Sequence, residues 1–169
     1  MFKYETPAYE VIIKDNSFEI RHYKDFYIVE YDNVDDPDIQ NGFGTLFRYI
    51  SSNNEENKKI NMTVPVIEEM TDNRLKMAFV VPKEHWEKIP RPNDPNLSIK
   101  EFRNGLFAVI RFSGLSNTSK EKMKLESLEA WIDQNGYDKA SNAMLAFYNA
   151  PFTPPMFRRN EIMVRVIPK

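Results

Sequence analysis

Residues 36–66 read DPDIQNGFGTLFRYISSNNEENKKINMTVPV, and the organisation of the chain follows from them. Asp36 is placed to cap the first helical amides, and Pro37 suits the first helical position because its missing N–H has no partner there. The apolar residues that follow recur at the period of one helix face. They are Ile39, Phe43, Leu46, Phe47 and Ile50. We therefore predict a helix that begins after Asp36 and ends near Ser51.

Runs rich in β-branched and aromatic residues predict strands on both sides of this helix. The predicted strands are residues 9–14, 18–23, 26–32, 62–69, 75–81, 97–102, 106–112, 143–149 and 161–167. A second helix is expected to open around Ser116-Asn117-Thr118, because Thr118 and Glu121 have the spacing of a capping box. Asn135-Gly136 supplies its stop signal. The proline-rich residues 83–96 are expected to form an extended connector.

From residue 18 and again from residue 97, the predicted elements follow the same order: strand, strand, helix, strand, strand. Residues 9–82 and 97–167 are therefore interpreted as an internal pseudo-repeat within one domain, residues 1–169. Such a duplication places two helices beside a largely antiparallel sheet. We expect an α+β fold.

Several motifs occur in a recognisable order. Residues 42–50 read Gly-Phe-x-x-Leu-x-x-Tyr-Ile, and residues 54–66 read Asn-x-x-x-x-Lys-Ile-x-Met-Thr-x-Pro-Val. The others are FEIRHY at 18–23, PRPNDP at 90–95, VIRFSG at 109–114 and RRNE at 158–161. The ordered set resembles the SOUL/haem-binding protein family from about residue 5 to residue 166. The resemblance implies a distorted antiparallel eight-stranded barrel flanked by two helices, and haem or another tetrapyrrole as ligand.

By motif position, the resemblance also implies a pocket along the first helix and the segment after it. Its predicted cofactor-binding residues are Phe43, Leu46, Phe47, Arg48, Ile50, Lys59 and Met62. Haem has a broad apolar face and two propionates, and Arg48 and Lys59 are the nearby cations. The same apolar residues would equally serve to pack the helix on the sheet.

His22 belongs to the Arg-His-Tyr motif, whose histidine has been proposed as an axial haem ligand in some family members. The resemblance therefore makes His22 a possible ligand of the haem iron. The alternative is a strand histidine that is hydrogen-bonded to a carboxylate or carbonyl. His85, the other histidine, lies among charged residues and is expected at the surface.

The composition excludes several classes of protein. An apolar content of 41% with 28% charged residues is ordinary for a soluble globular domain. The net charge of −2 gives no electrostatic footprint for nucleic acid. The absence of cysteine excludes disulfides and thiolate ligation of a metal or haem. No signal-peptide pattern and no membrane-length apolar run is present, so we expect a soluble cytoplasmic protein.

Catalytic signals are weak. Two histidines without cysteine make a poor zinc site. The sequence contains neither a Gly-x-Ser-x-Gly turn nor a glycine-rich phosphate loop. We therefore predict a binding protein, more consistent with a carrier or buffer of haem or another tetrapyrrole than with an enzyme.

Three alternatives stay open at this stage. The first is a module for amphipathic cations, like the effector-binding domains of bacterial regulators, with Glu30 or Glu101 as its carboxylate. The second is an enzyme that removes iron from haem and uses His22. The third is an interaction protein with a vestigial pocket.

Overall fold

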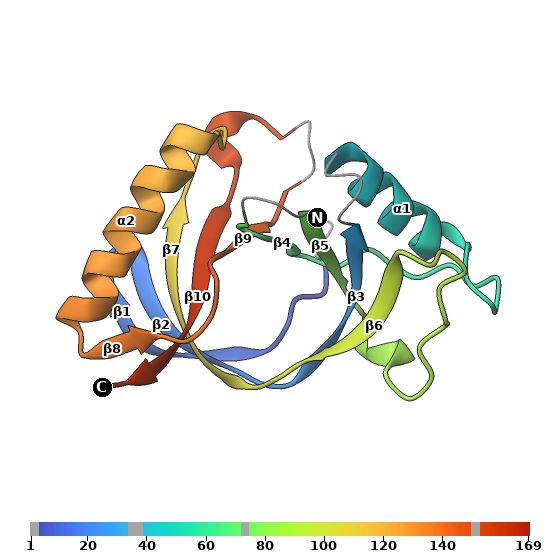
Figure 1. Ribbon diagram of the computed structural model, residues 1–169, viewed down its shortest axis with the longest axis horizontal. Helices are drawn as coiled ribbons and strands as arrows, with labels where there is room; N and C mark the ends of the chain where they lie inside the picture. Colours follow the sequence, from blue (N-terminus) through green and yellow to red (C-terminus); the bar gives the residue numbers. More distant parts are fainter. Residues whose placement is uncertain (1–3, 34–38, 72–74, 150–152) are drawn as a thin grey trace. The chain divides into compact units, whose positions relative to one another are not determined.

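The computed structural model describes residues 4–33, 39–71, 75–149 and 153–169. The chain divides into two compact units, each combining antiparallel strands with one long helix (Figure 1). Met1–Pro7 and Asp25–Arg103 form the α1 unit, and Ala8–Lys24 and Asn104–Lys169 form the α2 unit. Within the described residues, the predicted α+β fold with antiparallel strands and two helices is confirmed.

The α1 unit has the strand order β4-β5-β3-β6, and each neighbouring pair is antiparallel. Its elements are β3 (Phe26–Asn33), α1 (Ile39–Ser51), β4 (Val66–Glu69), β5 (Leu75–Val80), the 3-10 helix η1 (Lys83–His85) and β6 (Leu97–Phe102). α1 packs against β3 and β5. Leu46, Tyr49 and Ile50 enter a buried cluster with Val29 and Phe79. One face of α1 thus contributes to the core of this unit.

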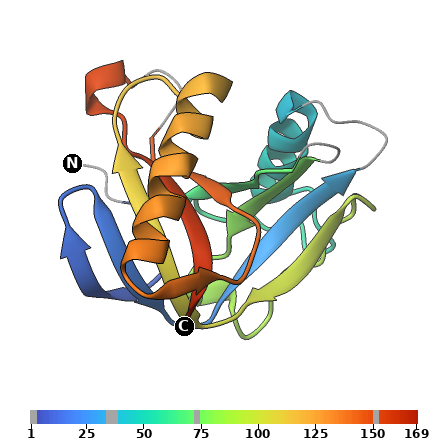
Figure 2. The ribbon, with the colours of Figure 1, turned by 60° about the vertical axis from the view of Figure 1, so that its left-hand side comes forward.

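The α2 unit has the strand order β1-β2-β7-β10-β9, with β8 paired to β10. Its elements are β1 (Tyr9–Asp15), β2 (Phe18–Tyr23), β7 (Gly105–Phe112), α2 (Thr118–Gln134), β8 (Tyr137–Lys139), β9 (Met144–Phe147), the 3-10 helix η2 (Pro155–Phe157) and β10 (Asn160–Pro168). α2 packs on β7 and β8 (Figure 2). Trp131 of α2 stacks on Phe18, and its indole N–H donates to the Asp15 carboxylate at 2.9 Å.

Most predicted strands are found within a few residues of their expected bounds. The clearest difference is the fourth, which begins at Val66 and not at residue 62. Pro65 has no N–H to donate to a ladder, and pairing with β5 starts at Val66. The short strand β8 was not predicted. The Asp36 and Pro37 start signals lie outside the described residues and stay predictions.

Each unit draws strands from both halves of the sequence. β2 pairs with β7, and β3 pairs with β6, each pair joining an early strand to a late one. The predicted pseudo-repeat therefore does not correspond to the two compact units, and the repeat itself stays a prediction. No helix in the described part of the chain is long and apolar enough to cross a membrane.

The N-terminus of α2 is capped differently from the prediction. Asn117, not Thr118, is the N-cap, and its Oδ1 accepts the backbone N–H of Lys120 at 2.9 Å. Glu121 instead accepts the Ser116 hydroxyl at 2.5 Å. Asparagine and threonine both have a side-chain oxygen that can accept a hydrogen bond at the N-cap, so the sequence alone does not distinguish Asn117 from Thr118. The predicted stop at Asn135-Gly136 is confirmed, with Gly136 at a φ of +80°.

Two alanine variants separate the caps. We expect Asn117→Ala to lower the free energy of unfolding by about 1 kcal/mol, because it removes the acceptor of an otherwise unpaired helical N–H. Thr118→Ala is the matched control and is expected to change it by less than about 0.5 kcal/mol. Urea unfolding followed by circular dichroism measures both. Equal losses in the two variants would contradict the assignment of Asn117 as the cap.

Candidate functional site

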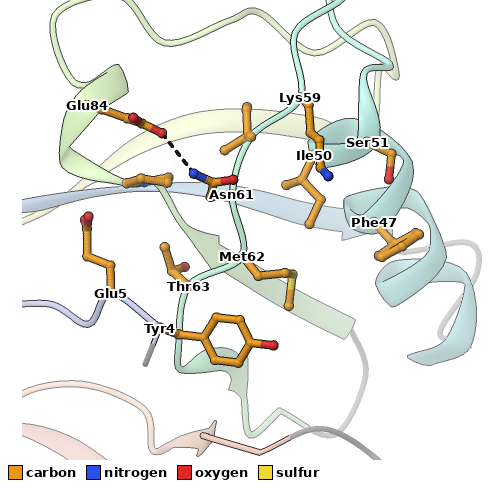
Figure 3. A pocket seen from close by; sticks show the side chains of 12 residues that line it. Tyr4, Glu5, Phe47, Ile50, Ser51, Lys59, Asn61, Met62, Thr63 and Glu84 are labelled. Carbon is orange, nitrogen blue, oxygen red and sulfur yellow. Dashed lines mark hydrogen bonds between the residues drawn. The ribbon is translucent and has the colours of Figure 1, made fainter. Parts of the chain in front are cut away.

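A cavity of about 600 Å³ lies at the C-terminal end of α1, within the α1 unit (Figure 3). α1 contributes Phe47, Ile50 and Ser51, and the segment after it contributes residues 59–63. The remaining lining residues are Tyr4, Glu5, Pro82 and Glu84. The volume lies within the range of about 300–1,000 Å³ that is usual for small-molecule sites.

Hydrogen bonds hold the segment 59–63 in place. The backbone N–H of Ile60 donates to the carbonyl of Ile50 at 2.7 Å, which ties the segment to the end of α1. The buried Thr63 hydroxyl donates to the carbonyl of Val80 at 2.6 Å, which ties it to β5. The motif Lys-Ile-x-Met-Thr thus forms one wall of the cavity and lies outside the named strands.

An apolar groove adjoins the cavity. It is lined by Phe43, Leu46, Phe47, Ile50, Met62, Val66 and Phe79. The side chains of Phe43 and Phe47 are 42% and 52% exposed, although they lie on the same apolar stripe as buried Leu46. Their rings are nearly parallel, at 16°, with centroids 6.4 Å apart. Because flat aromatic surfaces stack on other flat rings, this pair offers a platform for a planar apolar ligand.

Polar groups are found on the other walls of the cavity. Within the described residues, no carboxylate pairs with Lys59. Glu5 accepts the backbone N–H of Lys83 at 2.8 Å, and Glu84 accepts the side-chain amide of Asn61 at 3.4 Å. In the view of Figure 3, Glu5 and Glu84 lie on the side away from Phe47. Among the lining residues that the structure describes, Lys59 is therefore the cation available near the apolar wall.

Six of the eight predicted site residues line the cavity or the groove. They are Phe43, Leu46, Phe47, Ile50, Lys59 and Met62. Phe47, Ile50 and Met62 line both. Arg48 lines neither, because its guanidinium turns back along α1 and donates to the Thr45 hydroxyl at 3.1 Å. A role of Arg48 toward an anionic ligand stays a prediction.

His22 lies on β2 in the α2 unit, in register with Glu10 and Leu106. Its side chain is exposed, while Arg21 and Tyr23 on either side of it are buried. Ile20, two residues earlier on the same strand, is buried, so the exposure of His22 does not follow the alternation of the strand. Its role as an axial ligand stays a prediction.

Three other expectations from the sequence can be compared with the structure. The Glu30 carboxylate is partly buried and accepts the Lys100 ammonium at 2.6 Å, and Glu101 is exposed. Neither is an unpaired buried carboxylate of the kind that a cation-binding module needs. The expected surface position of His85 is wrong, because its side chain is only 13% exposed and its Nε2 lies 3.4 Å from Glu84.

The α2 unit contains a buried charge cluster that joins two of the sequence motifs. Arg21, which is 2% exposed, donates from both Nη atoms to the fully buried Glu161 carboxylate at 2.7 Å. Arg159 donates to the same carboxylate at 3.0 Å, and the Arg21 guanidinium also reaches the Tyr23 hydroxyl at 2.9 Å. The Arg-His-Tyr and Arg-Arg-Asn-Glu motifs thus meet in one buried network.

The electrostatics of this cluster have a clear direction. Burial opposes ionisation of Glu161, but hydrogen bonds and charge from Arg21 and then Arg159 outweigh it and hold its pKa below the usual value. Burial likewise raises the pKa of the Tyr148 hydroxyl, which has no hydrogen-bond partner among the described residues. The cluster is therefore charged at neutral pH. The part of the chain that the structure describes has no group of three or more His, Cys, Asp or Glu that could hold a metal ion.

Some lining residues had no signal in the sequence. Tyr4 and Glu5 reach the cavity because Glu5 forms an isolated parallel bridge with Thr63. Glu84 reaches it from η1. Both contacts join segments far apart in the chain, and neither segment has a periodic pattern that would have indicated them. Asn61 and Thr63, in contrast, lie inside a motif already singled out.

Comparisons with known proteins identify a family and two relatives. The model of the family described as SOUL heme-binding protein matches residues 4–165. The mouse protein named heme-binding protein 2 is 29% identical over 86% of this chain and 76% of its own length. The human protein of the same name is 27% identical over the same shares of the two chains.

Solved structures with much lower identity share the fold. The C-terminal domain of EcmrR has a TM-score of 0.64 at 11% identity, covering 95% of this chain and 99% of that domain. A structure described as a hydrolase from Listeria innocua has a TM-score of 0.60 at 11% identity, covering 92% and 94%. At this identity they inform on the fold alone. With its motifs in order and its family model matched over nearly the whole length, the chain belongs to the SOUL heme-binding protein family.

Proposed function

We propose that this protein binds haem or a related tetrapyrrole reversibly at the cavity beside α1, as a carrier or buffer. The observation that carries the proposal is the apolar wall of Phe47, Ile50 and Met62 beside the available cation Lys59. A tetrapyrrole presents the complementary chemistry, a flat apolar ring with carboxylates at its edge. The names of the mouse and human relatives support the same class of ligand.

Different residues of the cavity would contact different parts of the ligand. Phe47 and Met62 would contact the ring face, since aromatic rings and thioethers adapt to flat apolar surfaces. Phe43, stacked on Phe47, extends this wall. Lys59 would donate to a ring carboxylate. Bound iron would supply redox and ligand-binding chemistry, whereas these side chains position the ring and exclude water from it.

The described lining of the cavity contains no histidine. We therefore expect ring packing and carboxylate pairing to provide most of the affinity, so that metal-free protoporphyrin binds about as tightly as haemin. Titration of both ligands, followed by visible absorbance, tests this. Absence of saturable one-to-one binding of either ligand would overturn the proposal. Release of metal-free porphyrin from bound haem would instead favour an iron-removing enzyme.

Three variants test the site itself. We expect Phe47→Ala to weaken haemin binding roughly tenfold, because it removes most of one apolar wall. Lys59→Gln should weaken it by up to about fivefold, since the ion pair is partly exposed. Ile12→Ala is the matched control, because Ile12 is 51% exposed, like Phe47, and lies on β1 of the α2 unit. Equal weakening by the control and by Phe47→Ala would place the ligand elsewhere.

The same titration tests iron ligation by His22. If His22 is an axial ligand, His22→Ala should change the form of the Soret band at saturation. An identical band in both proteins would leave haem binding in place and remove His22 from the site.

A further inference from the structure

A groove of about 530 Å³ in the α2 unit is lined by five cationic side chains. They are Arg111, Lys120, Lys124, Arg158 and Arg159. The described lining contains no carboxylate. The whole chain has a net charge of −2, so the positive charge of this groove is a local feature.

Three of these cations are available to a ligand. Arg111, Lys120 and Lys124 have no ion-pair partner among the described residues, whereas Arg159 is held by the buried Glu161 carboxylate. The Lys120 ammonium donates one hydrogen bond to the Ser113 carbonyl at 2.6 Å and keeps two N–H donors for a ligand. The ammonium groups of Lys120 and Lys124 lie 5.6 Å and 5.9 Å from the centre of the Phe112 ring. Both ammonium groups lie near the same aromatic ring, so the two positive charges are concentrated in one part of the groove.

Large apolar side chains project beside this groove. Met156 and Phe157, on η2, are 75% and 70% exposed, and Leu115 is 57% exposed. The N–H of Gly114 donates to the carbonyl of Pro155 at 2.8 Å, which holds the segment of Leu115 against η2. Figures 1 and 2 both show η2 beside the N-terminal end of α2.

We propose that this end of the α2 unit docks onto a membrane surface that contains anionic phospholipid. Arg111, Lys120 and Lys124 would hold headgroup phosphates, and Met156 and Phe157 would enter the boundary between headgroups and acyl chains. Cations near an anionic bilayer and apolar side chains inserted at its interface each give weak binding, and the two together give stable attachment.

The combination of features favours a membrane over other anionic partners. A small soluble anion would use the cations of the groove and leave the apolar tip formed by Leu115, Met156 and Phe157 in water. An acidic peptide would do the same. Burying exposed apolar side chains of this size is favourable. An anionic membrane would both pair with the cations and bury the apolar tip, so it explains both features of this surface. Docking on a membrane would not require a bound tetrapyrrole.

Vesicle flotation with the full chain tests the proposal. We expect the protein to bind vesicles of phosphatidylcholine with about 30% phosphatidylserine at least tenfold more tightly than vesicles of phosphatidylcholine alone. Raising the salt from about 0.1 M to about 0.5 M should weaken the binding, because it screens the contribution of the cations.

Paired variants assign the binding to this surface. Arg111→Gln with Lys124→Gln should weaken binding to the anionic vesicles about 25-fold, at roughly fivefold for each cation. Met156→Ser with Phe157→Ser should weaken it at least tenfold, because the apolar tip is lost. The matched controls are Lys122→Gln, on an exposed α2 position outside the groove, and Ile12→Ser on β1. Both controls should bind like the wild type.

Several outcomes would overturn the proposal. Equal binding to both kinds of vesicle would show that the cations are not used. A small-anion site would be indicated if the protein bound soluble glycerophosphoserine tightly but did not bind vesicles. In that case the double variant Met156→Ser with Phe157→Ser should bind glycerophosphoserine as tightly as the wild type. Binding of a polyglutamate peptide without vesicle binding would indicate an acidic protein partner.

Discussion

Replacing Arg21 with methionine is expected to lower the free energy of unfolding by about 3–5 kcal/mol, because it leaves a buried carboxylate without its main partner. Arg21 is 2% exposed and Glu161 is fully buried, and two hydrogen bonds of 2.7 Å join them. Arg159 stays in contact with Glu161 but is bound to only one of its oxygens. Urea unfolding followed by circular dichroism measures the loss.

An exposed ion pair provides the control. Lys139 pairs with Glu129 in the same unit, with side-chain exposures of 49% and 35%. Lys139→Met likewise replaces the cation of a pair with methionine and should cost no more than about 1 kcal/mol. The double variant Arg21→Met with Glu161→Leu removes both buried charges and should be less destabilised than Arg21→Met alone. A double variant as unstable as the sum of its single variants would contradict the coupling.

The same pair predicts a pH dependence with a definite sign. The pKa of Glu161 is lower in the folded protein than in the unfolded chain, where it takes its ordinary value near 4.5. The pair therefore stabilises the fold fully above that ordinary value and loses its contribution as the pH falls through the lowered value. Because Glu161 titrates alike in the unfolded chains of wild type and Arg21→Met, we expect their stability difference to shrink as the pH falls toward the lowered pKa of Glu161 in the folded wild type. A stability difference that stays constant down to about pH 3 would contradict this expectation, because it would mean that Arg21 does not change the pKa of Glu161 in the folded protein.

The apolar stripe of α1 illustrates what periodicity can predict. Leu46, Ile50, Phe43 and Phe47 share one helical period, and the helix was correctly placed from it. Only Leu46 and Ile50 are buried, whereas the two phenylalanines are about half exposed. Periodicity identifies the face of a helix that is apolar, but the extent of the neighbouring sheet decides how much of that face is covered. The exposed part of the stripe is where we propose ligand binding.

The buried Arg21–Glu161 pair shows the opposite case. Both residues belong to motifs that were singled out, yet nothing in the sequence joins them, since they lie 140 positions apart. A charged residue inside an apolar strand is compatible with an exposed face as well as with a buried partner. The pairing follows from β2 and β10 both adjoining β7, which is information on topology and not on local pattern. The family motifs contain both residues, but only the three-dimensional fold shows that they are in contact.

Asn54 is the residue whose loss we expect to change both stability and ligand binding. It is 1% exposed, and its side-chain amide donates to the carbonyls of Tyr49 and Lys58 at 3.1 Å and 2.8 Å. Its Oδ1 accepts the backbone N–H groups of Glu56 and Lys58 at 3.2 Å and 3.1 Å. One side chain thus satisfies four backbone groups of the loop that leads from α1 to the cavity wall.

Asn54→Ala removes all four hydrogen bonds and leaves partly buried backbone groups without partners, so we expect a loss of about 2–4 kcal/mol in the free energy of unfolding. Because the loop positions Lys59 and Met62, haemin binding should also weaken roughly tenfold in protein that is still folded. Asn53→Ala is the matched control, since Asn53 is exposed and its side chain, among the described residues, accepts a hydrogen bond from Asn93 alone; it should change stability by no more than about 0.5 kcal/mol. Unchanged haemin affinity in folded Asn54→Ala protein would mean that the ligand does not contact the wall that this loop supports.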